Sequence, residues 1–145
     1  MIKKLTKNNL DELFELDNKI FKFDKYSKNQ ILEELSQEDR IYLGYFEGEK
    51  LVGFVGVQVV LETSDLLKIG VDKPYQRFGV ATKLFLELKQ TLKNLNVTTI
   101  MLEVREQNMP ATNFYKKMGF RQISKRDKYY QTDNALIFKL DLIWK

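Results

Sequence analysis

Segments with the periodicity of amphipathic helices alternate with β-branched, strand-like runs along the whole chain. Apolar residues at helical spacing predict four helices, which begin near residues 9, 27, 80 and 110. Strands are expected over residues 2–5, 41–46, 51–60, 66–71, 97–104, 120–124 and 135–142. The resulting order, β-α-α-β-β-β-α-β-α-β-β, predicts an α/β (α+β) fold with a mixed central sheet and helices on both faces. At 145 residues, we expect one domain spanning 1–145.

Local signals mark where several of these elements begin and end. Asn8 or Asn9 is expected to cap the first helix, and Ser27 with Gln30 has the spacing of a capping box. Residues 47–50 have the character of a hairpin loop. Pro110 suits the first turn of the last helix, and Gly119 suits the position just after its end.

The chain contains no cysteine and no histidine, which excludes many kinds of chemistry. Disulfides, thiol nucleophiles, acyl-cysteine intermediates and Ser-His-Asp triads are impossible, and the usual zinc sites lose their preferred ligands. No metal site is expected. Apolar runs reach only about six residues, far below the roughly 20 that span a bilayer, and the basic start leads into no signal-peptide core. We therefore expect a cytoplasmic protein that does not bind membranes.

Charge is distributed unevenly along the chain. Residues 1–50 carry 9 basic and 11 acidic side chains, whereas residues 51–145 carry 15 and 9, which gives +4 overall. The basic C-terminal part is compatible with nucleic acid, but a small molecule bearing phosphates explains it equally well. Direct nucleic-acid binding is not expected.

Residues 69–82 join a predicted strand to the long third helix through a loop that ends at Gly79. The first N–H groups of a helix have no intrahelical partners, and a glycine there allows a pyrophosphate to approach closely. The alternative is an ordinary connection in which Gly79 only satisfies a turn. The segment is neither a Walker loop nor a dinucleotide-binding fingerprint, because it lacks the residues that define them.

Two motifs resemble the GNAT superfamily of N-acetyltransferases. Gln76-Arg77-Phe78-Gly79-Val80-Ala81 resembles its Gln/Arg-x-x-Gly-x-Gly/Ala signature, with Ala81 in place of the more usual glycine. Residues 102–120 resemble the run Leu-Glu-Val-Arg-x-x-Asn-x-x-Ala-x-x-x-Tyr-x-x-x-Gly-Phe of its RimI-type branch, which acetylates the N-terminal alanine of a ribosomal protein. This chain departs from the branch at Pro110 and Asn113, which replace the small or apolar residues typical there. Related peptide acetyltransferases share much of the run. The element order matches the GNAT fold along essentially the whole chain.

The resemblance implies two catalytic residues. Glu103 matches the base that deprotonates the amine, directly or through water, and Tyr115 matches the group that donates a proton or hydrogen bond to the sulfur of coenzyme A. Without the resemblance, the favoured interpretation of Glu103 is a strand-end carboxylate paired with Arg105 or a lysine. Tyr115 would then be a core aromatic residue packed near Phe114 and Met118, and the resemblance reverses both interpretations.

The resemblance also implies contacts with acetyl-CoA, the expected cosubstrate. The backbone of one strand would bind pantetheine, and a backbone N–H around Val71 would stabilise the oxyanion. The following loop would bind the pyrophosphate, and Asn108 would bind the cofactor, cap a helix, or both. These residues are Ile69, Gly70, Val71, Arg77, Phe78, Gly79, Val80, Ala81, Thr82 and Asn108. Residues 125–130 resemble an Arg-x-x-Tyr-Tyr run that lines the peptide groove, which makes Tyr130 a candidate acceptor contact.

The expected function is transfer of an acetyl group to a protein N-terminal α-amine by direct attack in a ternary complex. By resemblance, the acceptor is the N-terminal alanine of small-subunit ribosomal protein eighteen, and the enzyme is a monomer or weak dimer. The alternatives are the same reaction on a lysine side chain, a polyamine or an antibiotic, and a non-catalytic module that binds acetyl-CoA. An acidic acceptor pocket would favour polyamines.

Overall fold

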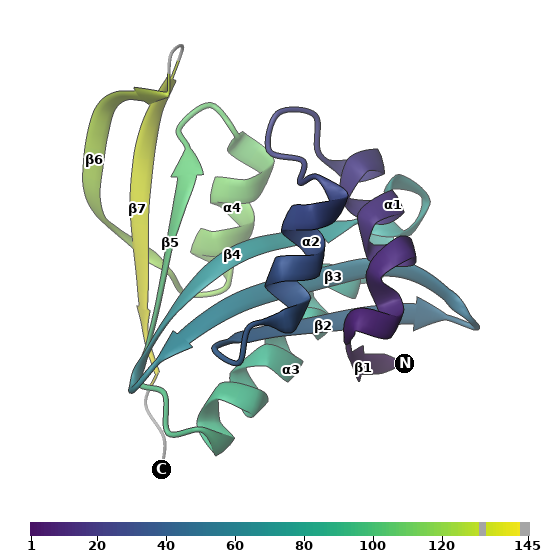
Figure 1. The fold of residues 1–145 in the computed structure, drawn as a ribbon. Coiled ribbons are helices and arrows are strands. Elements are labelled where there is room, and N and C mark those ends of the chain that lie inside the picture. The colour runs from purple at the N-terminus through teal and green to yellow at the C-terminus, as the bar shows by residue number, and fades with distance from the viewer. Residues whose placement is uncertain (131–132, 143–145) are drawn as a thin grey trace.

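The computed structural model describes residues 1–130 and 133–142, and side chains within 1–128 and 133–142. Seven strands and four α-helices follow one another in the predicted order (Figure 1). The strands are β1 (Ile2–Lys4), β2 (Arg40–Glu47), β3 (Lys50–Val60), β4 (Thr63–Val71), β5 (Thr99–Arg105), β6 (Arg121–Tyr130) and β7 (Asp133–Asp141). The helices are α1 (Leu10–Ile20), α2 (Lys28–Ser36), α3 (Val80–Asn94) and α4 (Met109–Lys117), with 3₁₀ turns η1 (Lys7–Asn9) and η2 (Lys73–Phe78).

All seven strands belong to one sheet with the order β1-β2-β3-β4-β5-β7-β6. Neighbours are antiparallel except β4 and β5, which pair in parallel over only three positions, from Thr63↔Thr99 to Asp65↔Met101. Beyond this point β4 and β5 diverge, so that the sheet opens into a V (Figure 1). This opening at the centre of the sheet is the feature that positions the site described below.

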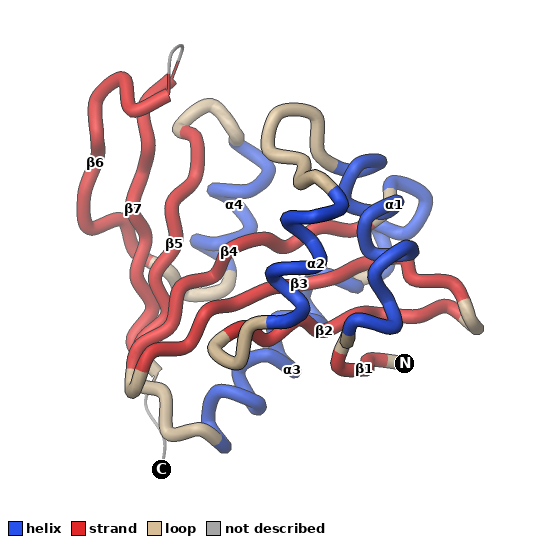
Figure 2. Tube along the Cα trace, in the orientation of Figure 1, coloured by secondary structure: helices blue, strands red, loops and turns tan. Residues whose placement is uncertain are grey.

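Helices cover both faces of the sheet, as the sequence predicts (Figure 2). On one face, buried positions of α3 at helical spacing, including Leu84, Phe85 and Leu88, pack with Tyr115 of α4 and with β3, β4, β5 and β7. On the other face, Leu13 and Leu16 of α1 and Ile31 of α2 form a second cluster. The two cores hold the diverging strands from opposite sides.

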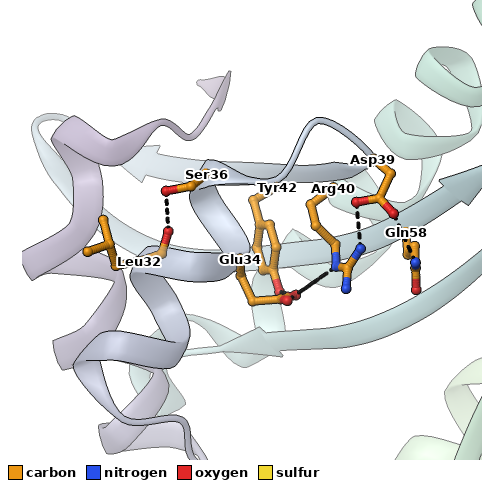
Figure 3. A network of polar contacts seen from close by, with 7 residues as sticks. All are labelled: Leu32, Glu34, Ser36, Asp39, Arg40, Tyr42 and Gln58. Atoms are coloured by element: carbon orange, nitrogen blue, oxygen red, sulfur yellow. Dashed lines mark hydrogen bonds and ion pairs between the residues drawn. The ribbon is translucent and has the colours of Figure 1, made fainter.

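A polar network attaches α2 to the sheet (Figure 3). The Glu34 carboxylate accepts a hydrogen bond of 2.7 Å from the Tyr42 hydroxyl and pairs with the Arg40 guanidinium at 3.2 Å. Arg40 also contacts Asp39 at 2.6 Å, and Asp39 accepts a hydrogen bond of 3.0 Å from Gln58 on β3. Burial and the adjacent Glu34 carboxylate raise the pKa of Tyr42 far above its ordinary value, so this hydroxyl remains a donor.

The boundaries of several elements differ from the predictions. Strand β6 continues to Tyr130, beyond the strand predicted over residues 120–124, because an edge strand with a solvated face needs no apolar alternation. The loop predicted before Gly79 contains the 3₁₀ turn η2. Thr6 caps η1, whereas Asn9 precedes α1 without a side-chain capping bond. The capping box of Ser27 and Gln30 is confirmed.

Candidate active site

Strand β4 has an unpaired backbone edge facing the opening. Its other edge pairs with β3 through Gly53↔Val71, whereas pairing with β5 stops at Asp65 within the described residues. The Asp72 N–H donates to the Val52 carbonyl, and successive residues of an antiparallel strand point their backbone groups to alternate sides. Ile69 and Val71 therefore direct their N–H and C=O groups into the opening. The Val71 carbonyl accepts a hydrogen bond of 3.1 Å from the Gln76 side chain.

A cavity of about 760 Å³ occupies the opening on the side of α1 and α2. Glu103 and Tyr115, the predicted catalytic residues, both line it, together with Ile69 and Asn108. Residues 21–27, which connect α1 to α2, contribute Phe21, Asp24, Lys25 and Tyr26 to its wall. The fold thus brings together in one hollow side chains that lie as much as 116 positions apart, from Phe21 to Ile137.

Glu103 lies on β5 and points into this cavity. Its neighbours Leu102 and Val104 are buried on the α3 and α4 face, so the alternation of the strand directs Glu103 to the opposite face. The carboxylate is 35% exposed and pairs at 3.0 Å with the guanidinium of Arg126 on β6. The ion pair considered for Glu103 is therefore present, but its partner is Arg126 and not Arg105 or a lysine; Arg105 pairs with Asp24 at 3.4 Å. Glu103 is accessible to an amine as well as ion-paired.

Tyr115 lies in the second half of α4, with its ring among Phe114, Phe120 and Phe138 at centroid separations of 5.6 to 6.4 Å. It is 7% exposed, and its hydroxyl has no hydrogen-bond partner among the residues that the structure describes. Burial raises the pKa of this hydroxyl well above its ordinary value. The group therefore keeps its proton at neutral pH and is suited to donating a hydrogen bond or a proton.

Gly79 joins η2 to α3 in the left-handed conformation, with φ = 71°. A Cβ added at this residue would meet no atom within 4 Å, so the space beside the helix start is open. The N–H groups of Val80, Ala81 and Thr82 begin the helix and precede the first intrahelical bond, from the Lys83 N–H to the Gly79 carbonyl. Arg77 and the 68% exposed Phe78 complete this segment. The arrangement can bind a phosphate through backbone N–H groups.

The remaining predicted residues have distinct positions. Asn108 is the N-cap of α4, where its side chain accepts a 3.3 Å hydrogen bond from the Ala111 N–H. Gly70 packs against the end of α1 and the residue that follows it, since a Cβ there would lie 3.2 Å from Ile20 and 3.1 Å from Phe21. Of the predicted set, Ile69, Asn108, Glu103 and Tyr115 line the cavity, whereas Gly70, Val71 and residues 77–82 do not. The Tyr130 side chain lies outside the described side chains.

Sequence reasoning gave no role to three side chains that the structure places at the site. Gln76 belongs to the recognised signature, and its spacing from Val71 could have suggested the hydrogen bond it donates. Arg126 opens the Arg-x-x-Tyr-Tyr run, but its contact with Glu103 depends on two strands separated by β7. Lys68 pairs with Asp17, which lies 51 residues away, and no local pattern signals such a pair.

Comparison with known proteins gives consistent matches. Residues 10–120 match the acetyltransferase (GNAT) family. A [Ribosomal protein bS18]-alanine N-acetyltransferase of Haemophilus ducreyi is 30% identical over 98% of this chain and 100% of that protein. A spermidine N(1)-acetyltransferase of Thermoplasma acidophilum is 29% identical over 68% of this chain and 63% of that protein.

Among solved structures, the ribosomal-protein-S18-alanine N-acetyltransferase of Escherichia coli has a TM-score of 0.92. The two share 27% identity over 100% of this chain and 95% of that one. The whole sheet and its helices are therefore common to both proteins. With the family match over most of its length and a relative aligned from end to end, the chain belongs to the acetyltransferase (GNAT) family and is an N-acetyltransferase.

Proposed function

We propose that the protein transfers the acetyl group of acetyl-CoA to a protein N-terminal α-amine, with the N-terminal alanine of ribosomal protein bS18 as the acceptor. The observation that carries the proposal is the shared cavity, which holds an accessible carboxylate, Glu103, and a protonated phenol, Tyr115. The acceptor follows from the relative in Haemophilus ducreyi and the structure from Escherichia coli, whose names specify that alanine. We infer that residues 1–145 form one domain of a cytoplasmic enzyme.

The residues present fit acetyl-CoA as the donor. The unpaired edge of β4 at Ile69 and Val71 offers backbone groups to the amides of pantetheine, which would extend the sheet as a partial strand. The open space at Gly79 and the N–H groups that begin α3 suit the pyrophosphate. These two features lie in consecutive segments of the chain, as a single extended ligand requires.

The chemistry assigns different tasks to the two cavity residues. An α-ammonium group has a pKa near 8, so a base is required for a useful fraction of attacking amine at neutral pH. Glu103 accepts that proton, directly or through water, and the amine nitrogen attacks the thioester carbon. A Val71 N–H stabilises the resulting oxyanion. When the C–S bond breaks, Tyr115 donates a proton or hydrogen bond to the departing sulfur.

The charges that line the cavity distinguish this function from polyamine acetylation. Three carboxylates face it, those of Asp24, Asp65 and Glu103, against four cationic side chains, those of Lys25, Lys68, Arg105 and Arg126. Two of the carboxylates are already ion-paired, with Arg105 and Arg126, and Lys68 is paired with the buried Asp17, which leaves Asp65 and Lys25 without an ion pair among the described residues. A polycation gains most from a site with excess negative charge, and this cavity has none. A peptide terminus, which carries a single amine charge, fits better.

A coenzyme A-release assay tests the proposal with matched acceptors. A hexapeptide that begins with alanine is compared with the same peptide blocked at its N-terminus and containing lysine, and with polyamines and aminoglycosides. Turnover on the free alanine terminus alone is expected. Turnover confined to lysine or to small amines would refute the proposed acceptor, and acetyl-CoA binding without turnover on any amine would favour a non-catalytic module.

A further inference from the structure

The connection between α1 and α2, residues 21–27, forms one wall of the cavity that contains Glu103. Phe21, Asp24, Lys25 and Tyr26 line this wall. The connection has no regular secondary structure that would fix its shape, and its Asp24 pairs with Arg105 at the end of β5. Its position relative to Glu103 therefore depends on side-chain contacts with the sheet.

The ammonium group of Lys68, on β4, makes most of those contacts. Its Nζ pairs with the Asp17 carboxylate of α1 at 2.6 Å and donates a hydrogen bond to the Asp24 carbonyl. The same nitrogen lies over the Tyr26 ring, 3.5 Å from its centroid, and 4.7 Å from the centroid of Phe21. One buried cation thus contacts three residues of the connection and the end of the helix that precedes it.

Asp17 connects the same elements from the other side. Its second carboxylate oxygen accepts a 2.7 Å hydrogen bond from the Tyr26 N–H, and the Phe21 N–H donates to its backbone carbonyl at 2.9 Å. The Asp17 side chain is fully buried and the Lys68 side chain is 6% exposed. Burial lowers the pKa of Lys68, and the adjacent Asp17 carboxylate opposes this effect. A buried ion pair with cation–π contacts holds its partners firmly in place, because loss of one partner would leave the other charge buried and uncompensated.

A second contact ties the connection to the opposite strand of the opening. Arg105 on β5 pairs with the Asp24 carboxylate at 3.4 Å and lies 5.9 Å from the centroid of the Phe23 ring. The connection is therefore held to β4 by Lys68 and to β5 by Arg105, the two strands that diverge. Of these contacts, the one made by Lys68 is buried, and buried ion pairs hold geometry more firmly than exposed ones.

We propose that Lys68 is a positioning residue that fixes the α1–α2 connection as the wall against which the acceptor chain lies, so that its amine reaches Glu103. This inference rests on the proposed function, because it assigns the acceptor to the cavity. Lys68 touches neither acetyl-CoA nor the reacting atoms. Its loss should therefore weaken use of the acceptor and leave use of acetyl-CoA unchanged, since the edge of β4 and the start of α3 form no part of the connection.

The test measures KM for acetyl-CoA and for the alanine-terminated hexapeptide in Lys68→Met, which keeps the aliphatic stem and removes the cation. We expect kcat/KM for the peptide to fall by about 10- to 100-fold, mostly through KM, with KM for acetyl-CoA changed less than twofold. Backbone amides of residues 21–27, including that of Tyr26, should exchange with deuterium faster than in the wild type, while those of β3 should not. Tyr26→Leu retains the ion pair and should show the same pattern more weakly, even if Lys68→Met folds poorly.

Lys19→Met is the matched control. Lys19 also links α1 to the sheet, through Asp72 just after the end of β4 at 2.9 Å, but among the described residues it makes no ion pair or hydrogen bond with the connection. It should leave the peptide KM near the wild-type value. An equal rise in peptide KM in Lys19→Met, an equal loss for both substrates in Lys68→Met, or unchanged exchange over residues 21–27 would overturn the inference. If the wild type acetylates another amine, the proposed acceptor is wrong. The same comparison of Lys68→Met with Lys19→Met, made on that amine, still tests the role of Lys68.

Discussion

Replacing Tyr115 by phenylalanine separates catalysis from stability more cleanly than any other single change at the site. The ring and its contacts with Phe114, Phe120 and Phe138 are retained. The hydroxyl that is lost has no hydrogen-bond partner among the described residues, so its removal leaves no buried group unsatisfied. We expect the free energy of unfolding to change by no more than about 0.5 kcal/mol.

The expected effect on turnover is much larger. If the hydroxyl protonates the departing sulfur, its loss should lower kcat by a factor of about 10²–10⁴, which is the usual contribution of a positioned general acid. KM for acetyl-CoA should change little, because the proposed contacts with the pyrophosphate and pantetheine come from the backbone near Gly79 and Val71. Steady-state coenzyme A release, with each substrate varied in turn, measures both quantities.

Tyr42→Phe provides the reverse pattern as a control. This hydroxyl donates a 2.7 Å hydrogen bond to the Glu34 carboxylate, in the network that attaches α2 (Figure 3). A hydrogen bond to a charged group contributes about 1.5–3 kcal/mol, and we expect a loss of about 2 kcal/mol because Glu34 keeps its contact with Arg40. At about 3 °C per kcal/mol for a domain of this size, Tm should fall by about 6 °C. The kcat at 25 °C should be unchanged.

Calorimetry and kinetics on Tyr115→Phe and Tyr42→Phe together show whether the Tyr115 hydroxyl serves catalysis or stability. Wild-type kcat in Tyr115→Phe would show that Tyr115 is a core residue and that the sulfur receives its proton elsewhere. A fall in Tm of several degrees in Tyr115→Phe would show that its hydroxyl has a partner that the reasoning has missed. Reduced kcat in Tyr42→Phe would mean that α2 affects the chemistry.

Three further predictions concern the base, the phosphate-binding segment and alkaline pH. Glu103→Gln should lower kcat by about 10²–10⁴ while acetyl-CoA affinity, measured by titration calorimetry, is retained; wild-type kcat would exclude Glu103 as the base. Gly79→Val and the control Gly48→Val replace glycines at φ = 71° and 61° with open space around them, so each should cost about 1–2 kcal/mol in a denaturant titration, but only Gly79→Val should weaken acetyl-CoA binding. Burial raises the folded-state pKa of Tyr42 and Tyr115, so the folded state retains protons that the unfolded state releases, and stability should fall above pH 10 by up to about 1.4 kcal/mol per pH unit for each. Denaturant unfolding between pH 9 and 11 should show that the free energy of unfolding falls less steeply with pH in Tyr42→Phe than in the wild type. An equal fall in both proteins would contradict the raised pKa of Tyr42.

The sequence by itself determined the order of elements, the covering of the sheet on both faces and the two motifs of the family. These properties depend on local patterns: the helical spacing of apolar residues in α3, the capping box at Ser27 and the turn glycine at position 79. It also excluded cysteine and histidine chemistry outright. The candidate residues Glu103 and Tyr115 came from a motif confined to one β-α segment of the chain.

The tertiary structure alone decided which side chains surround those residues. Glu103 meets Arg126 across β7, Lys68 meets Asp17 between β4 and α1, and neither contact follows from spacing along the chain. The polar second half of β6 became a strand because it pairs with β7, although no apolar alternation predicts a strand there. Pairing between strands and burial against helices involve residues distant in sequence, so their energies appear only when the chain is folded. The opening between β4 and β5, on which the proposed chemistry depends, is a property of the assembled sheet.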